Sequence, residues 1–290
     1  MRRIPARFRV APLAMMSLLA MAGAHLLAAW SPQLSPQPSV DSLHRPLDEL
    51  LDLYVRDGLV YYRALKVDRP KLDRYVASLA GSSAGSASAA GSREEQVAFW
   101  LNAYDAFVLQ TVIDHYPIRG RAAGYPAGSI RQIPGAFDRV RHRAAGRSVT
   151  LDEIETGLLG AFSDPRVFLA LGRGAVGSGR LRSEAYVAAR LEQQLAGTAD
   201  EAAQSSRMVR IDQPQGQVSV SQIFAWRQEA FIATYAGNAM NLAGRTPIER
   251  AILGFVGPHL LQTERAFLEK NTFQLKYQDM DWHLNDLTGR

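Results

Sequence analysis

The chain has 290 residues, of which 47% are hydrophobic, and a formal net charge of +5 at neutral pH. A chain of this length and composition can bury a sizeable core, so an intrinsically disordered protein is excluded. It contains no cysteine, which excludes disulfides, thiol catalysis and thiolate metal sites.

Residues 1–24 have the pattern of a secretory signal peptide. Four arginines and no acid stand in Met1 to Val10, an apolar run follows, and Ala22-Gly23-Ala24 offers a small-x-small cleavage site. We predict cleavage near His25 and a periplasmic or secreted mature protein. The alternative is an inner-membrane anchor over residues 10–30, because this apolar run is long enough to span a bilayer if it is not cut.

Most of the net positive charge lies in this leader. Without its four arginines the chain keeps 29 of its 33 Lys and Arg residues against 28 Asp and Glu. Because no basic stripe is left, we predict no nucleic-acid partner. The expected partner is an unknown small molecule or an envelope protein, and membrane contact is expected only through an uncleaved N-terminal segment.

Two stretches lack the regular spacing of apolar residues that is typical of a helix or a strand. Residues 25–46 are rich in Pro and Ser and predict an extended tether, so the globular domain is expected over residues 47–290. Residues 81–92 (GSSAGSASAAGS) predict a mobile surface loop between two helices.

Apolar spacing predicts three helices in the first part of the domain, over residues 47–57, 70–80 and 93–116. The second has Pro70 where a proline of the first turn belongs. The third is the longest, and its apolar stripe is expected to face the core. The stripe consists of Val97, Trp100, Leu101, Tyr104, Phe107, Val108 and Val112.

The later part alternates between hairpins and helices. Thr150 and Glu153 form a capping box at the start of a helix over residues 152–159, and Thr246 with the following Pro and Glu starts another. The other expected elements are hairpins around residues 144–147 and 213–216, strands over 167–171 and 273–277, and helices over 183–197 and 221–235. Together these elements predict an α+β fold, a predominantly helical single domain with a small, mostly antiparallel sheet.

The letters GRGAVG at Gly172 to Gly177 fit the dinucleotide fingerprint G-x-G-x-x-G. A dinucleotide-binding unit places an acid about 20 residues further on, at the tip of a second strand. Here that position is Glu192, inside a predicted helix, and no Walker lysine follows the glycines. We therefore predict no nucleotide and no other cofactor, and the absence of any His-rich or acidic metal motif predicts no metal site.

Six ordered segments resemble the domain of unknown function 547 family and together cover nearly the whole of Leu47 to Asp286. They are 98–110 (AFWLNAYDAFVLQ), 129–137 (SIRQIPGAF), 149–155 (VTLDEIE), 163–186 (SDPRVFLALGRGAVGSGRLRSEAY), 218–226 (VSVSQIFAW) and 281–286 (DWHLND).

Several positions depart from what this resemblance implies. It implies histidine where the chain has Phe168, cysteines where it has Arg173 and Ser178, and a Pro-Pro pair where it has Gly179 and Arg180. The glycines are therefore expected to replace a turn that packs a strand against a helix. Loss of the thiol and the histidine favours an exported envelope binding or scaffold module, or a degenerate enzyme.

The alternative function is a hydrolase or transferase in which Ser178 has replaced a thiol nucleophile. Ser178 is thus the best catalytic candidate, although serine needs a base, and none of the histidines at 115, 142, 259 and 283 can be assigned as one. A histidine ring nitrogen within hydrogen-bond reach of Ser178 would favour this enzyme.

Polar or amphipathic residues in the resembling segments are the ligand-binding candidates, and structural explanations compete for several of them. Asn102 is expected to tie a loop backbone to its helix, Glu153 to cap a helix, and Arg166 to pair internally with Asp164. Glu155 is expected to be an exposed helix glutamate. The candidates are Asn102, Tyr104, Asp105, Glu153, Asp164, Arg166, Trp226, Asp281 and Asn285. Convergence of Ser178, Arg166, Asn102 and Asp281 on one cleft would indicate a site.

Overall fold

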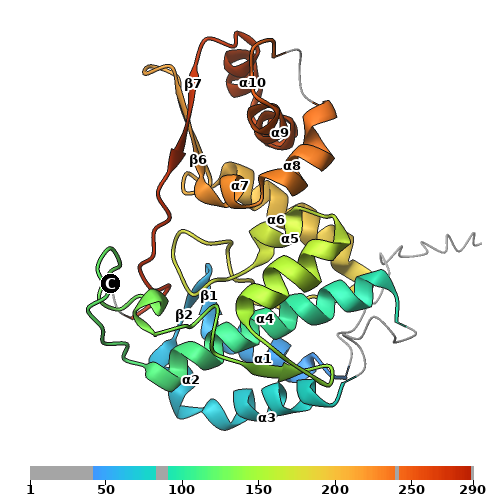
Figure 1. Ribbon diagram of the computed structural model, residues 1–290, viewed down its shortest axis with the longest axis vertical. Helices are drawn as coiled ribbons and strands as arrows, with labels where there is room; N and C mark the ends of the chain where they lie inside the picture. Colours follow the sequence, from blue (N-terminus) through green and yellow to red (C-terminus); the bar gives the residue numbers. More distant parts are fainter. Residues whose placement is uncertain (1–41, 83–90, 239–241, 289–290) are drawn as a thin grey trace, which may run out of the picture. The chain divides into compact units, whose positions relative to one another are not determined.

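The computed structural model describes residues 42–82, 91–238 and 242–288, all of which belong to one compact unit over Pro38–Arg290. Helices predominate, and the strands of the described residues form two two-stranded sheets and one three-stranded sheet (Figure 1). The α+β fold is therefore confirmed. The predicted signal, the tether as far as residue 41 and residues 83–90 of the Gly/Ser loop lie outside the described residues.

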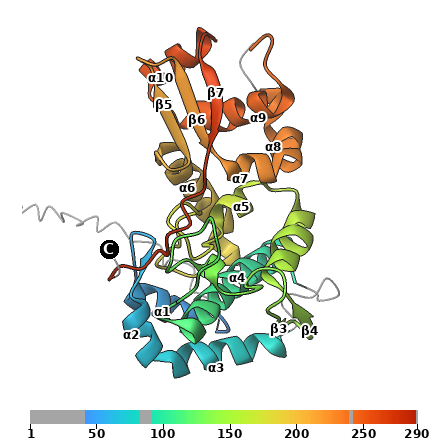
Figure 2. The same cartoon turned by 60° about the vertical axis from the view of Figure 1, so that its left-hand side comes forward.

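A long central helix organises the N-terminal half. Helices α1 (Arg45–Tyr54), α2 (Tyr62–Val67) and α3 (Arg69–Ala80) precede α4 (Arg93–His115), which packs against α2 and α3 (Figures 1 and 2). The expected stripe of α4 is buried, but so are residues on its other faces, including Asn102 and Asp105. A helix apolar on every side lies inside the core, so each polar residue in it needs a partner.

The first predicted helix ends earlier than expected. Residues expected as its last turn form β1 (Val55–Arg56), which pairs antiparallel with β2 (Leu59–Val60). Asp57 and Gly58 adopt left-handed backbone conformations, with φ of 51° and 77°. Such residues end a helix and close a tight turn, and the helical period of the side chains does not reveal this.

The middle of the chain confirms one hairpin and corrects one strand. β3 (His142–Ala144) and β4 (Arg147–Val149) form the predicted hairpin, and the short helix η1 (Ile130–Gln132) precedes them. Residues 167–171, predicted as a strand, lie mostly in helix α5 (Arg166–Ala170). A five-residue apolar run does not distinguish a buried helix from a buried strand. Here Asp164 accepts a hydrogen bond from the Arg166 N–H and starts the helix.

Two further helices differ from expectation. After Leu151 and Asp152 the chain forms the π-helix η2 (Glu153–Leu159), followed by η3 (Gly160–Phe162). The helix expected over residues 183–197 starts later, as η4 (Ala188–Arg190) and α6 (Leu191–Gln204). Its first residues are not helical because the backbone of Tyr186 bonds to the side chain of Asn102.

The C-terminal half holds a three-stranded sheet with helices beside it. β5 (Val209–Asp212) and β6 (Gln217–Ser221) form the predicted hairpin, and β7 (Gln274–Gln278) joins β6 in parallel, with Gln217 opposite Gln274. The helix expected over 221–235 is broken at Arg227 into α7 (Gln222–Trp226) and α8 (Gln228–Tyr235). The remaining elements are η5 (Ala236–Asn238), α9 (Pro247–Val256), η6 (Gly257–His259) and α10 (Gln262–Glu269).

After β7 the chain runs back to the first hairpin, formed by β1 and β2 (Figures 1 and 2). The Val60 N–H donates to the Asn285 carbonyl at 2.8 Å, and the Leu287 N–H donates to the Val60 carbonyl at 3.0 Å. The last residues of the domain thus extend the first hairpin.

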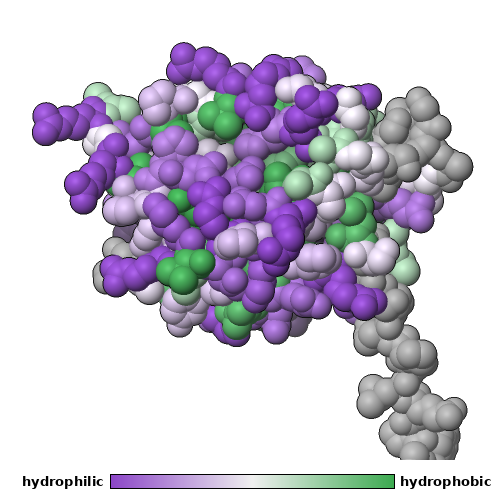
Figure 3. Space-filling model, turned by 90° about the horizontal axis from the view of Figure 1, so that it is seen from below, coloured by the Kyte–Doolittle hydropathy of each residue, from purple (hydrophilic) through white to green (hydrophobic). Residues whose placement is uncertain are grey.

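The surface seen from below Figure 1 is largely hydrophilic, with hydrophobic residues in separate spots (Figure 3). Within the described ranges, no helix combines the length and apolar character needed to cross a membrane.

Candidate functional site

A cavity of about 480 Å³ lies beside the glycine loop. Ser178, Gly179 and Arg180 line it from the loop, and α6 and Asn285 contribute to its walls. Both charge signs are present, since Arg180 lies 2.9 Å from Asp57 and 3.9 Å from Glu201.

The Ser178 hydroxyl is engaged by its own loop. Its oxygen lies 2.6 Å from the Ala175 carbonyl and 3.1 Å from the Gly179 carbonyl, and its single proton can be donated to only one of them. Across the part of the chain that the structure describes, no histidine ring nitrogen bonds to Ser178. His283, whose backbone carbonyl accepts from the Val176 N–H of the same loop, has a side chain that is 71% exposed and its Nδ1 2.7 Å from Asp281.

Close packing explains two glycines of the loop. A Cβ at Gly177 would lie 2.5 Å from the Asp281 nitrogen, and a Cβ at Gly179 would overlap the Leu169 carbonyl. The loop backbone therefore lies directly against the C-terminal segment and the end of α5. This is a packing role, and it involves a helix where the sequence predicted a strand.

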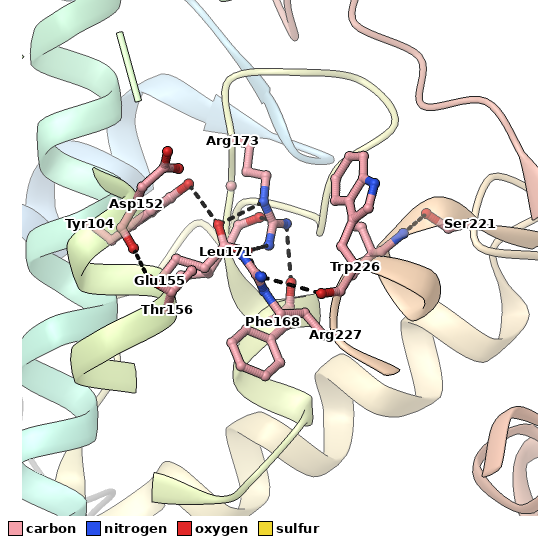
Figure 4. A network of polar contacts seen from close by, with 12 residues as sticks. Tyr104, Asp152, Glu155, Thr156, Phe168, Leu171, Arg173, Ser221, Trp226 and Arg227 are labelled. Carbon is pink, nitrogen blue, oxygen red and sulfur yellow. Dashed lines mark hydrogen bonds and ion pairs between the residues drawn. The ribbon is translucent and has the colours of Figure 1, made fainter. Parts of the chain in front are cut away.

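A second polar centre is buried behind the loop, around Glu155 (Figure 4). Arg173 donates from Nη2 to one Glu155 oxygen at 2.7 Å and from Nε to the other at 3.1 Å. Arg227 donates to Glu155 from Nη2 at 2.7 Å and from Nε at 3.1 Å. The Tyr104 hydroxyl lies 3.4 Å from Glu155. We call these four residues the Glu155 network.

Four parts of the chain meet in this network, and Tyr104 comes from α4. Glu155 comes from η2, Arg173 from the glycine loop and Arg227 from the break between α7 and α8 (Figure 4). Glu155 and Arg173 are each 3% exposed, so the expectation of an exposed Glu155 is wrong. Burial alone would raise the pKa of Glu155, but Arg173 and then Arg227 hold this pKa below its usual value. The carboxylate stays charged between two guanidinium groups.

Two positions that depart from the resemblance lie together here. Arg173 Nη1 donates to the Phe168 carbonyl at 3.1 Å, and the Arg227 guanidinium lies over the Phe168 ring, 5.3 Å from its centroid. The resemblance places cysteine and histidine at positions 173 and 168. Both positions thus hold groups that belong to an internal ion network, while the other departures, Ser178, Gly179 and Arg180, line the separate cavity.

Three predicted ligand candidates lie on α4. Asn102 donates to the Tyr186 carbonyl at 2.9 Å and accepts from the Tyr186 N–H at 2.8 Å, so it ties the loop to the helix. Asp105 accepts from the Gly172 N–H at 3.1 Å, and burial raises its pKa to about 8. Tyr104 belongs to the Glu155 network, and burial followed by the charge of Glu155 raises its pKa.

The other candidates are spread over the domain. Glu153 caps its helix through Thr150, and Asp164 pairs with Arg166 at 2.9 Å. The Asp281 carboxylate contacts the His283 ring, and the Asn285 side chain accepts from the Tyr62 hydroxyl and donates to the Gly58 carbonyl. Trp226 is 39% exposed, and its ring stacks on Trp282.

The four residues whose convergence on one cleft would indicate a site do not converge. Of the predicted residues, Ser178 and Asn285 share the cavity, Tyr104 joins the Glu155 network, and Asn102, Arg166 and Asp281 line neither. Arg173 and Arg227 belong to the Glu155 network but were not among the residues predicted from the sequence. The one available signal for Arg173 was its place at a position where the resemblance implies cysteine. Among the described residues, no group of three or more His, Asp or Glu is arranged to hold a metal ion.

Residues 89–201 match the family model described as "Protein of unknown function, DUF547". Neither curated proteins nor solved structures give a match to the chain.

Proposed function

The chain belongs to the family of proteins of unknown function DUF547 through residues 89–201, and from this premise we propose that it is an exported envelope protein that acts as a binding or scaffold module rather than as an enzyme. The matched residues contain the glycine loop, Glu155 and Arg173, so the proposal concerns the part of the chain that defines the family.

One observation carries the proposal. The guanidinium of Arg173 forms a bidentate ion pair with Glu155, at 2.7 and 3.1 Å, at a position where the resemblance implies cysteine. A guanidinium is neither a nucleophile nor a base at neutral pH. Phe168, in contact with the same group, has no titratable atom. The positions at which the resemblance implies cysteine and histidine therefore supply neither a thiol nor an imidazole, and the Glu155 carboxylate is paired with two guanidinium groups.

Ser178 is the residue on which the enzymatic alternative depends. A serine nucleophile needs a base that removes its proton, and the Ser178 hydroxyl lies against backbone carbonyls that accept a hydrogen bond without removing the proton. We therefore expect Ser178 to be a turn residue that keeps the loop closed beside the cavity.

A fluorophosphonate probe tests this alternative directly. Purified mature protein should show no covalent labelling, and the Ser178→Ala variant should behave the same as the wild type. Labelling of the wild type that is lost in Ser178→Ala would establish Ser178 as an activated nucleophile and overturn the non-catalytic proposal.

The export part of the proposal rests on the arginine-rich and apolar N-terminal sequence. Cell fractionation followed by N-terminal sequencing should give a mature chain that begins near His25 in the periplasmic or secreted fraction. An intact Met1 in the membrane fraction would show an anchor instead.

A further inference from the structure

An arginine between aromatic rings lies apart from the Ser178 cavity. The Arg131 guanidinium carbon is 4.2 Å from the ring centroid of Trp282, 4.5 Å from that of Phe137 and 5.8 Å from that of Tyr125. Trp226 extends the group, since its ring stacks on Trp282 at 6.3 Å with an interplanar angle of 25°. We call these five residues the Arg131 cluster.

The cluster reaches the surface through two of its rings. Tyr125 and Trp226 are each 39% exposed, and the Tyr125 ring meets the edge of Trp282 at 90°. Exposed aromatic faces next to a cation are a common way to bind the ring of a small ligand, because the rings offer apolar contact area at little cost in conformational entropy.

The guanidinium of Arg131 has unused hydrogen-bond donors. Within the described residues it makes no hydrogen bond and no ion pair, and its Nε is buried without a partner. The arginines of the Glu155 network and Arg166 each bond to one or more carboxylates. A buried donor without a partner is costly, and a guanidinium fork matches the two oxygens of a carboxylate.

A cavity of about 230 Å³ lies at this position. Tyr125, Arg131 and Phe137 line it, together with Asp138 and the turn over residues 133–136. Asp152 also interacts electrostatically with Arg131: burial and then the charge of Glu155 raise the pKa of Asp152, whereas the charge of Arg131 lowers it. Two acids near one unpaired cation favour a ligand with a single negative charge over a phosphate dianion.

We propose that this cavity binds a ring-bearing monocarboxylate, with the carboxylate on the donor edge of Arg131 and the ring against Tyr125. The site goes beyond the proposed function, since it does not involve Ser178 or the Glu155 network. Aromatic acids and sugar acids share this chemistry, and the choice of probes distinguishes them.

Isothermal titration calorimetry of the mature chain with benzoate and with glucuronate tests the site. At least one of them should bind, whereas the neutral analogues benzamide and glucose should bind at least about 10-fold more weakly, because they lack the charge-assisted pair with Arg131. Inorganic phosphate should also be weak. Absence of binding for both acids, or equal binding of each acid and its neutral analogue, would refute the proposal.

Variants assign the binding to Arg131. Arg131→Gln should reduce affinity about 10-fold or more, and Arg131→Lys should recover only part of it, because lysine keeps the charge and loses the fork. Arg143→Gln, an exposed arginine on β3, is the matched control and should keep wild-type affinity. Should Arg131→Gln unfold, Tyr125→Leu at the exposed ring should still weaken binding. Wild-type affinity in the folded Arg131 or Tyr125 variants would show that the cluster is only structural.

Discussion

Asn102 and Asp105 lie three residues apart on α4, and both are buried. Their polar side chains differ in how many hydrogen-bond partners they have. Asn102 exchanges two hydrogen bonds with the backbone of Tyr186. Asp105 has one backbone donor, the Gly172 N–H, and burial raises its pKa to about 8. The uncharged amide of Asn102 therefore has a partner for both its oxygen and its nitrogen, whereas the carboxyl of Asp105 favours its protonated form at neutral pH.

Substitution of the first residue should be costly. Asn102→Ala leaves the N–H and carbonyl of Tyr186 unpaired in the core, so we expect a loss of about 1 to 3 kcal/mol in the free energy of unfolding. Urea denaturation followed by circular dichroism measures this. An unchanged denaturation midpoint would mean that the two bonds contribute nothing to stability, and it would return Asn102 to the ligand-binding candidates.

Asp105 should make stability depend on pH in a defined direction. Its native pKa of about 8 exceeds its usual value of 3.8, so the folded state holds the proton more tightly than the unfolded state. The resulting stabilisation is complete below about pH 4 and is lost as the pH rises toward 8. Asp105→Asn keeps an oxygen for the Gly172 N–H and cannot ionise. This variant should gain about 5 kcal/mol on the wild type between pH 4 and pH 8.

Thermal melts of both proteins over this pH range test the prediction. Parallel pH profiles would contradict it, because they would show that Asp105 has the same pKa in the folded and unfolded states. Asp138→Asn, which changes an exposed carboxylate, is a suitable control for the general effect of removing one negative charge.

At the scale of elements, the Glu155 network explains why two helices have unusual forms. Glu153 and Glu155 belong to the same π-helix, yet Glu153 faces Arg141 at the surface and Glu155 points into the core. A π-helix widens the turn, which is a known device for placing one side chain off the regular helical face. Arg227 sits where α7 ends and α8 begins, and its side chain bonds to Glu155.

Removal of the central charge should destabilise these elements together. Glu155→Gln leaves the buried Arg173 and the half-buried Arg227 without a counter-charge, so we expect a loss of about 3 to 5 kcal/mol. Arg227→Gln should cost less, about 1 to 2 kcal/mol, because Arg173 still pairs with the carboxylate and the Arg227 side chain is 24% exposed. Chemical denaturation of the two variants measures both values. A larger loss for Arg227→Gln than for Glu155→Gln would contradict the central place of Glu155.

At the scale of the whole described unit, the segment after β7 joins the C-terminal end of the domain to the first hairpin. The segment after β7 bonds to β2 on both sides of Val60, and the Tyr62 hydroxyl donates to the Asn285 side chain at 2.7 Å. The same segment contacts the glycine loop, where Ala175 pairs with Leu284. Contacts between residues so distant in the chain form only in the folded domain, so the last residues close the core of the first helices.

Deletion of residues 283–290 should therefore weaken the domain far from the cut. Loss of the bonds to Val60 and Tyr62 leaves buried polar groups unpaired, and the melting temperature should fall by roughly 10 °C or more. Hydrogen exchange should show lost protection at Val60, in the first hairpin. Tyr62→Phe, which removes one of these bonds, should have a small effect in the same direction. Retained protection at Val60 in the deletion variant would contradict this.

Much of the architecture was determined by the sequence alone, wherever the signal is local. The length of α4, the turns of the second and third hairpins and the capping boxes at Thr150 and Thr246 follow from side chains within a few residues of each other. Capping and apolar period act through nearest neighbours along the chain, and for that reason they can be recognised before the fold is known. The absence of cysteine and the resemblance to the family whose model matches residues 89–201 were also recognised at this level.

Only the tertiary structure decided the polar centres. Residues 167–170 form a helix and not a strand, and Glu155 is buried and not exposed. Arg173 and Arg227 meet on one carboxylate although 54 positions in the numbering separate them. A short apolar run fits two structures, and the charge of a glutamate does not tell which face of a helix it occupies. These outcomes depend on which distant residues pack together, and burial then sets the energy of each charge.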